Sequence, residues 1–175
     1  MLAIKKRLLA LINTREAFEL TKAFETLFNT QCLGSAALAI NAATAATWKM
    51  SNATPLPYSI TGQLYLKTAA AAQAIPAAAA LTATANQAVM VTLALDAAGN
   101  ITTYTSGVSV STVSSAVAVA NLIPAFVPDN LCVIGVLVIA SVATVFTPGT
   151  TALDAVGITV TYINTTGPFF PIAPV

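Results

Sequence analysis

Hydrophobic and polar residues alternate with a period of two in several short segments from residue 58 onward. In residues 58–67, Ile60, Leu64 and Leu66 share one parity, and mostly polar residues occupy the other. Successive side chains of a β-strand point to opposite faces. The pattern therefore predicts one half-buried strand with these three aliphatic residues on its buried side.

The same alternation predicts two strands joined by a hairpin turn, and one strand near the end of the chain. Residues 88–95 carry four aliphatic side chains on one face: Val89, Val91, Leu93 and Leu95. Residues 96–100 read Asp-Ala-Ala-Gly-Asn, a turn of hairpin length whose Gly and Asn tolerate positive φ. Residues 101–105 are then the partner strand. The last strand is predicted at 155–164, where one face carries Val156, Ile158, Val160 and Tyr162.

Residues 131–146 are apolar at nearly every position, which predicts a strand buried on both faces. Each face must then be covered by a sheet, a helix or another subunit. The segment is too short for a membrane-spanning helix, which needs roughly 20 continuous apolar residues, and Gly135 interrupts it. A Thr-Pro-Gly-Thr-Thr turn at 147–151 ends the strand, and a short helix is predicted upstream at 114–121.

The first 30 residues have a helical period instead. Their apolar residues recur at spacings of three and four: Ala17, Leu20, Phe24 and Leu27, with Phe18 and Phe28 widening the stripe. Asn13 or Thr14 can cap the start of this helix. An amphipathic helix needs a partner for its stripe, which is its own domain, a sister copy or another protein.

Three other segments are predicted to lack regular structure. Residues 31–57 are rich in Ala, Thr and Asn, which favours an extended or irregular connector pinned to the core by Trp48. Residues 68–80 form an Ala-rich loop. The tail, residues 166–175, contains three prolines, which cannot join the interior of a sheet. We expect this tail to be an extended arm laid on a surface.

These elements predict a mainly β fold, an antiparallel β-sandwich or jelly-roll-like domain with an N-terminal amphipathic helix and an extended C-terminal tail. The chain divides into a helix and connector at 1–57, the β domain at 58–165 and the tail at 166–175. Both ends carry apolar residues with too few neighbours to cover them locally. The candidate assembly contacts are therefore these side chains of the two ends: Phe18, Leu20, Phe24, Leu27, Phe28, Phe169, Phe170 and Ile172.

Charge is scarce in this sequence and is concentrated at its start. Charged residues make up 7% of the chain, against about 25% in a typical soluble domain. Eight of the thirteen charged residues lie in the first 25 positions. A free monomer with so few charges would be poorly soluble. We therefore expect protein to cover much of the surface, most simply in a homo-oligomer, with a trimer favoured.

The basic residues give little reason to expect a nucleic-acid partner or an export signal. The net charge of +1 implies no general attraction to nucleic acid. One basic cluster, at 5–7, is either a solvated helix start, which we favour, or a contact with nucleic acid or an acidic protein surface. The apolar stretch at 8–12 is short for a signal peptide and lacks a small-residue cleavage site, which favours an intracellular start.

The sequence lacks the usual groups of an enzyme active site. There is no His, the commonest general base and metal ligand. Its six carboxylates form no pair placed for acid–base work, and neither a Gly-rich phosphate loop nor a GxSxG motif is present. Cys32 and Cys132 have no CxxC partner and are expected to be two small buried hydrophobes. We predict no enzyme, cofactor, metal or small-molecule substrate.

Four segments within residues 58–164 carry a resemblance to a known class of protein. They are LYLKTAAA at 64–71, LALDAAGNIT at 93–102, VIGVLV at 133–138 and FTPGTTALDAVGITVTY at 146–162. This part of the chain resembles the capsid decoration, or cement, proteins and related head-surface proteins of tailed bacteriophages. The N-terminal helix and the Pro-rich tail fall outside the resemblance.

The resemblance implies a homotrimer of β-sandwiches or jelly rolls on the exterior of a virion. Made in the host cytoplasm, it would contact the major capsid protein and bridge capsomers, which stabilises the head. Neither nucleic acid nor a membrane would be a partner. Two alternatives remain: a fibre or baseplate component of the same virion, and a glycan-binding adhesin. A glycan site needs clustered aromatic residues, and those of this chain are scattered: Trp48, Tyr58, Tyr65, Tyr104 and Tyr162.

Overall fold

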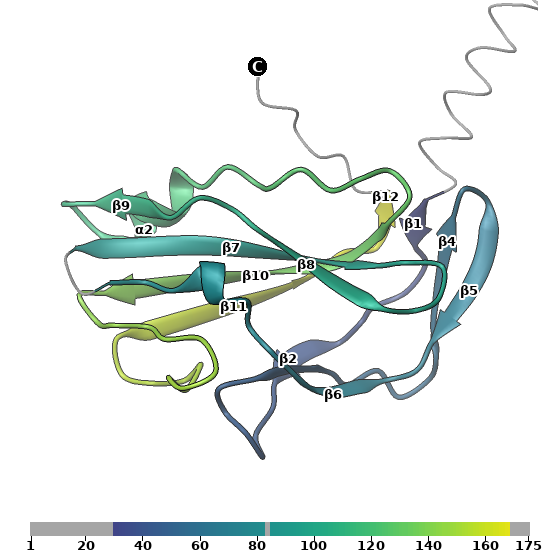
Figure 1. Ribbon diagram of the computed structural model, residues 1–175, viewed down its shortest axis with the longest axis horizontal. Helices are drawn as coiled ribbons and strands as arrows, with labels where there is room; N and C mark the ends of the chain where they lie inside the picture. The colour runs from purple at the N-terminus through teal and green to yellow at the C-terminus, as the bar shows by residue number, and fades with distance from the viewer. Residues whose placement is uncertain (1–29, 83–84, 169–175) are drawn as a thin grey trace, which may run out of the picture.

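The computed structural model describes residues 30–82 and 85–168, which form a mainly β fold built from antiparallel sheets (Figure 1). The strands are β1 (Gln31–Cys32), β2 (Leu38–Ile40), β3 (Trp48–Met50), β4 (Leu56–Ile60), β5 (Gln63–Lys67), β6 (Ala70–Gln73), β7 (Asn86–Leu95), β8 (Ile101–Thr105), β9 (Ser109–Ser111), β10 (Cys132–Val142), β11 (Ile158–Asn164) and β12 (Gly167–Pro168). The helical elements are η1 (Ala77–Ala79), a 3-10 turn, and α2 (Ser115–Ala120). The amphipathic helix predicted in the first 30 residues falls almost wholly outside the described residues, as does the tail from residue 169.

The strands form three sheets. The largest has the order β11-β10-β7-β8, with β9 also paired to β7. A four-stranded sheet, β12-β1-β4-β5, lies at one end of the molecule (Figure 1), and a three-stranded sheet has the order β2-β3-β6. The largest hydrophobic cluster draws buried side chains from all three sheets, so they share one core.

The long strands have the faces that the sequence predicts. In β7, the side chains of Val89, Val91, Leu93 and Leu95 are fully buried in the core. In β10, ten of the eleven residues are buried, which confirms a strand covered on both faces. The turn at residues 96–100 is confirmed as well. The carboxylate of Asp96 accepts hydrogen bonds from the backbone N–H and the side-chain amide of Asn100, both at 2.8 Å, which lowers the pKa of Asp96.

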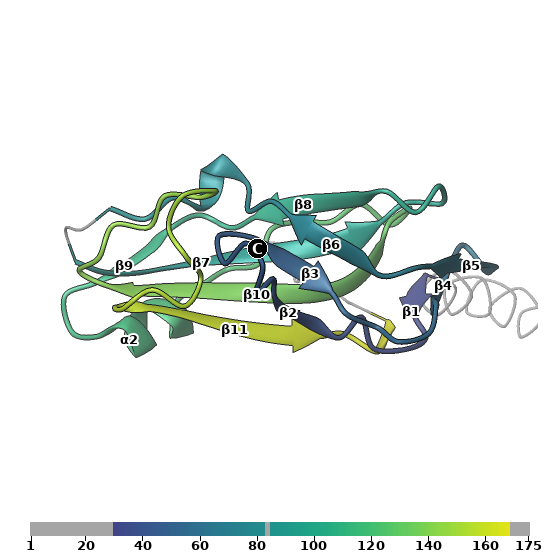
Figure 2. The same cartoon turned by 90° about the horizontal axis from the view of Figure 1, so that it is seen from below.

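The chain itself supplies the second cover of β10. On the side away from the main core, Ala118 of α2 packs against Ala88 and Ala140. Farther along the same side, Val127 packs against Val133. Figure 2 shows α2 and η1 on opposite sides of the large sheet. The predicted helix is thus confirmed as α2, and β10 needs no other subunit to be covered.

The connector predicted for residues 31–57 is instead part of the fold. It contains β1, which pairs with β4 and β12, and the two strands β2 and β3, which pair with each other while β3 also pairs with β6. These strands are two or three residues long, too short for a period of two to be visible in sequence. Trp48 is buried as predicted, and its Nε1 donates to the Ala74 carbonyl at 3.2 Å. The predicted boundary at residue 58 falls inside β4.

Two other predictions need local correction. The Ala-rich loop at 68–80 contains β6 and η1. The last strand begins at Ile158, so that Val156 precedes it and is 96% exposed rather than buried. Within the strand the predicted sides hold, since Ile158 is buried and Thr159 is exposed. The turn at 147–151 is confirmed by a hydrogen bond from the Thr151 N–H to the Thr147 carbonyl.

The strand predicted at residues 58–67 is a hairpin, in which β4 and β5 are joined by Thr61 and Gly62. Both residues have positive φ, 50° and 82°, as a two-residue turn of type I′ requires. Residues that pair across a hairpin share a face, and Ile60 pairs with Gln63. The turn therefore reverses the parity of β5, and Leu64 and Leu66 point outward rather than into the core.

Candidate interaction surface

The outer side of the four-stranded sheet carries a row of apolar side chains. In β4, Leu56, Tyr58 and Ile60 are buried in the core, so the residues between them face outward. Pro57 pairs with Leu66, and Ser59 pairs with Leu64. The N–H of Leu33 donates to the Pro57 carbonyl at 3.0 Å, which places Leu33 beside the same row. We call this surface the leucine face; it consists of Leu33, Pro57, Leu64 and Leu66.

The leucines of this face are well exposed to solvent. The exposed fraction is 47% for Leu33, 62% for Leu64 and 67% for Leu66. Fully burying a leucine side chain contributes about 1.5–3 kcal/mol, so covering three that are roughly half exposed would contribute several kcal/mol. Single exposed apolar residues are common, whereas adjacent ones mark interaction sites.

The surroundings of the leucine face are almost uncharged. Across residues 30–82 and 85–168, the charged side chains are Lys49, Lys67, Asp96, Asp129 and Asp154. Lys67 pairs with Leu56 and so belongs to the opposite side of the sheet. β5 is also the last strand of its sheet, so its outer edge has no partner strand among the described residues.

The first and last strands of the described chain are neighbours in this sheet. Gln31 pairs with Pro168 and Cys32 with Gly167, so β1 and β12 are neighbours (Figure 1). Phe28 is three residues from Gln31, a span of at most about 10 Å, and Phe169 directly follows Pro168. The topology therefore joins the two predicted assembly segments to the sheet that bears the leucine face.

None of the predicted contact residues is itself placed by the structure. All eight lie outside the described residues: Phe18, Leu20, Phe24, Leu27, Phe28, Phe169, Phe170 and Ile172. Sequence reasoning missed the leucines of β5 because it put them in the core. Thr61-Gly62 was the signal that could have found them, since a Gly between two alternating runs is typical of a hairpin turn.

Tyr58 holds the four-stranded sheet to the large sheet. Its ring stacks on Tyr65 with 5.4 Å between ring centroids, and its hydroxyl donates to the Asp96 carbonyl at 2.9 Å. Burial, and then the negative charge of Asp96, raise the pKa of Tyr58. The leucine face thus has a fixed support, because the strand behind it is anchored by packing and by a hydrogen bond.

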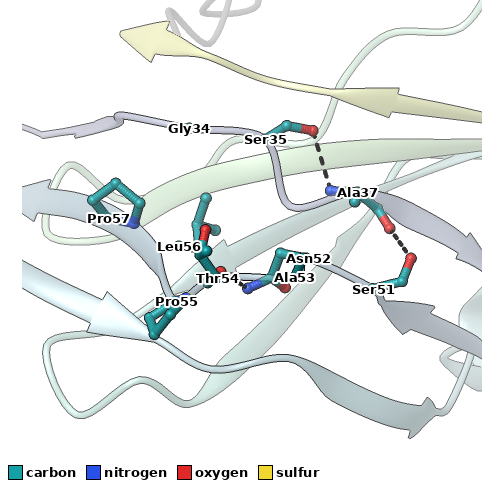
Figure 3. Close-up of a pocket in the computed structure, with 10 residues that line it drawn as sticks. All are labelled: Gly34, Ser35, Ala37, Ser51, Asn52, Ala53, Thr54, Pro55, Leu56 and Pro57. Carbon is teal, nitrogen blue, oxygen red and sulfur yellow. Dashed lines mark hydrogen bonds between the residues drawn. The ribbon is translucent and has the colours of Figure 1, made fainter.

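A pocket of about 390 Å³ lies beside this sheet, between the segments 34–37 and 51–57 (Figure 3). Its polar side chains hold the neighbouring backbone. Ser51 donates to the Ala37 carbonyl at 2.6 Å, Ser35 accepts from the Ala37 N–H at 3.2 Å, and the Asn52 amide donates to the Thr54 carbonyl at 2.8 Å. The lining contains neither a charged nor an aromatic side chain. It therefore offers no acid–base pair and no stacking platform for a sugar.

The described residues form neither a metal site nor a membrane-spanning helix. Among the residues that the structure describes, no three His, Cys, Asp or Glu side chains gather to hold a metal ion. The described helices include none long and apolar enough to cross a membrane. In comparisons with known proteins, no family model, no curated protein and no solved structure matches the chain.

Proposed function

We propose that this chain is a non-enzymatic structural protein that assembles through the leucine face. The assembly is the head of a tailed bacteriophage, where the chain acts as a capsid decoration protein. The observation that carries the proposal is the exposed row of Leu33, Leu64 and Leu66 on the sheet from which both apolar ends lead. A surface of this kind favours protein contact over solvent.

Within this proposal the fold is an antiparallel β-sandwich of the jelly-roll kind, with the five-stranded sheet as one layer. Copies of the chain form a homotrimer that sits on the capsid exterior and contacts the major capsid protein. Bridging neighbouring capsomers adds contacts that must break before the shell opens. Because the attachment is multivalent, each contact can be modest.

A fibre or baseplate role in the same virion is the principal alternative, because it would use the same apolar face. A glycan-binding adhesin has less support. Trp48 and Tyr58 are buried, and the pocket has no aromatic lining, so none of these offers the stacking surface that a sugar site needs.

The test is the double variant Leu64→Thr and Leu66→Thr. Threonine is β-branched and suits a strand, and it lacks most of the apolar surface of leucine. We expect sedimentation at micromolar concentration to shift from trimer to monomer, and occupancy on particles to fall at least tenfold. The melting temperature of the isolated chain should change by only a few degrees, because both leucines are already exposed.

Val156→Thr is the matched control, because Val156 is 96% exposed and lies outside the four-stranded sheet. It should leave both sedimentation and occupancy unchanged. A double variant that still forms trimers and still binds particles would reject the leucine face as the assembly surface. Electron cryo-microscopy of particles separates the two virion roles, since density on the shell supports decoration and density on the tail supports the fibre alternative.

A further inference from the structure

The two cysteines of the chain meet in the core. Cys32 lies in β1 and Cys132 begins β10, and neither side chain is exposed. The four-stranded sheet, which contains β1, and the large sheet, which contains β10, are linked near these cysteines by a hydrogen bond. Cys32 pairs with Tyr58, Cys132 pairs with Leu95, and the Tyr58 hydroxyl donates to the carbonyl of Asp96, the residue after Leu95.

Both thiols belong to the same buried cluster, and their strands, β1 and β10, are in contact. The Cys32 thiol donates to the Gly34 carbonyl at 3.0 Å, and the Cys132 thiol lies 3.9 Å from the Val133 carbonyl. The neighbouring Cys132 thiol lowers the pKa of Cys32 to about 7, although burial acts in the opposite direction. The neighbouring Cys32 thiol and burial raise the pKa of Cys132. A thiolate is the nucleophile in disulfide exchange. The lowered pKa of Cys32 favours its thiolate, so Cys32 is the first nucleophile and Cys132 is the second cysteine of the pair.

We propose that Cys32 and Cys132 form an intramolecular disulfide that locks the four-stranded sheet to the large sheet. The proposal rests on the side-by-side burial of two thiols from different sheets, which the sequence separates by on the order of 100 residues. Both cysteines are free and buried in the structure.

The oxidant is a disulfide of low molecular mass, of the glutathione class. The Cys32 thiolate attacks one sulfur of this disulfide, which releases one thiol and leaves a mixed disulfide on Cys32. The Cys132 sulfur then attacks the Cys32 sulfur, and the second thiol leaves. The two cysteines lose two electrons and two protons, and the two released thiols carry both away. Because β1 contains two residues, local opening of this short strand is the route by which the oxidant enters.

The disulfide would strengthen the part of the molecule that bears the leucine face. β1 lies between β12 and β4, and in sequence it directly follows the N-terminal segment. A covalent bond from β1 to the central strand β10 would carry any load on that segment into the large sheet. This consequence rests on the proposed assembly function, whereas the bond itself does not.

The experiment oxidises the full-length chain with oxidised glutathione, once in buffer and once in mild denaturant that is then removed. Intact mass and non-reducing peptide mapping follow the product. We expect the mass to fall by two hydrogens and one peptide pair to link Cys32 to Cys132, without dimer formation. The melting temperature of the oxidised form should exceed that of the reduced form by about 10 °C, because closing so long a loop removes much unfolded-state entropy.

Cys32→Ala and Cys132→Ala serve as matched controls, and each should lose the linkage and the redox dependence of the melting temperature. Three results with the unsubstituted chain would overturn the proposal: persistent glutathione adducts, intermolecular dimers only, or two free thiols after oxidation in denaturant. Since these readouts do not involve assembly, their failure would leave the proposed function standing. Loss of trimers in the leucine variants would likewise leave the disulfide untouched.

Discussion

Single residues set how closely the sheets approach one another. Gly135 lies in the middle of β10, where Leu38 of β2 reaches across and packs against its backbone. A Cβ atom at Gly135 would collide with Leu38 Cδ1 and would lie 2.6 Å from the carbonyl oxygen of Ile163 in the adjacent strand. The absence of a side chain here is therefore a packing requirement rather than a need for an unusual φ.

We predict that Gly135→Ala destabilises the chain by about 1–3 kcal/mol, since over-packing forces neighbouring side chains and backbone to move. Denaturant unfolding measures this change. Gly107→Ala is the control, because a Cβ there meets nothing within 4 Å, and it should be neutral or slightly stabilising. Equal midpoints for the two variants would show that Leu38 and β11 can shift without cost.

At the scale of elements, the β4–β5 hairpin determines which residues reach the surface. Its turn places Thr61 at a φ of 50°, a region that a β-branched residue occupies at a cost. Two local hydrogen bonds offset part of that cost. The Thr61 N–H donates to the Thr30 hydroxyl at 3.1 Å, and the Thr61 hydroxyl donates to the Ile60 carbonyl at 2.8 Å.

Thr61→Asn should stabilise the chain by about 0.5–1 kcal/mol, because Asn-Gly is the preferred pair for a two-residue turn with positive φ. Thermal unfolding is the measurement. The same substitution at Thr102, an exposed strand residue of β8, should be neutral or destabilising because Asn is disfavoured in strands. A loss of stability at both sites would mean that the hydroxyl contacts of Thr61 outweigh its backbone strain.

The elements that the sequence predicts well are those with a long or clearly bounded pattern. Among the strands, β7, β8 and β10 have such a pattern. The start of α2 is marked by its N-cap Ser114, whose hydroxyl accepts a hydrogen bond from the Val117 N–H at 3.3 Å. The strands of 31–57 depend instead on partners far away in sequence. For example, the Leu38 N–H donates to the Asn164 side chain at 3.0 Å. No local pattern encodes such a contact.

The candidate surface escaped prediction for a related reason. A period of two identifies the two faces of a strand but not which of them is buried, and that choice depends on register. Here a two-residue turn changes the register, so apolar residues that would suit a core lie at the surface. The scarcity of charge in the sequence led us to expect a surface covered by protein, whereas the position of the exposed leucines on β5 required the fold.

At the scale of the whole molecule, the structure changes which feature gives the reason to expect assembly. β10 was predicted to need covering on both faces, and the chain supplies both covers through its main core, α2 and the segment that follows α2. The case for a partner now rests on the leucine face and on the scarcity of charge. The leucine face lies at the end of the molecule where β1 and β12 are side by side.

The two ends should therefore be needed for assembly and dispensable for folding. Among the described residues, all buried members of the main core lie between Cys32 and Ile158. Removing residues 1–29 or 169–175 should thus leave a cooperative melting transition within a few degrees of the full chain. Each removal should lower the trimer fraction in sedimentation and the occupancy on particles.

Side-chain substitutions in the N-terminal segment sharpen this last prediction, because deletion removes apolar and charged residues together. Phe24→Ser with Leu27→Ser takes away the apolar stripe that the sequence predicts, whereas Glu19→Ser with Glu25→Ser changes the charged positions. If the stripe makes the contact, the first pair should weaken assembly about as much as deletion, and the second pair should have little effect. Should the first pair abolish the melting transition instead, the segment would belong to the chain's own core and the assembly role of this end would be wrong.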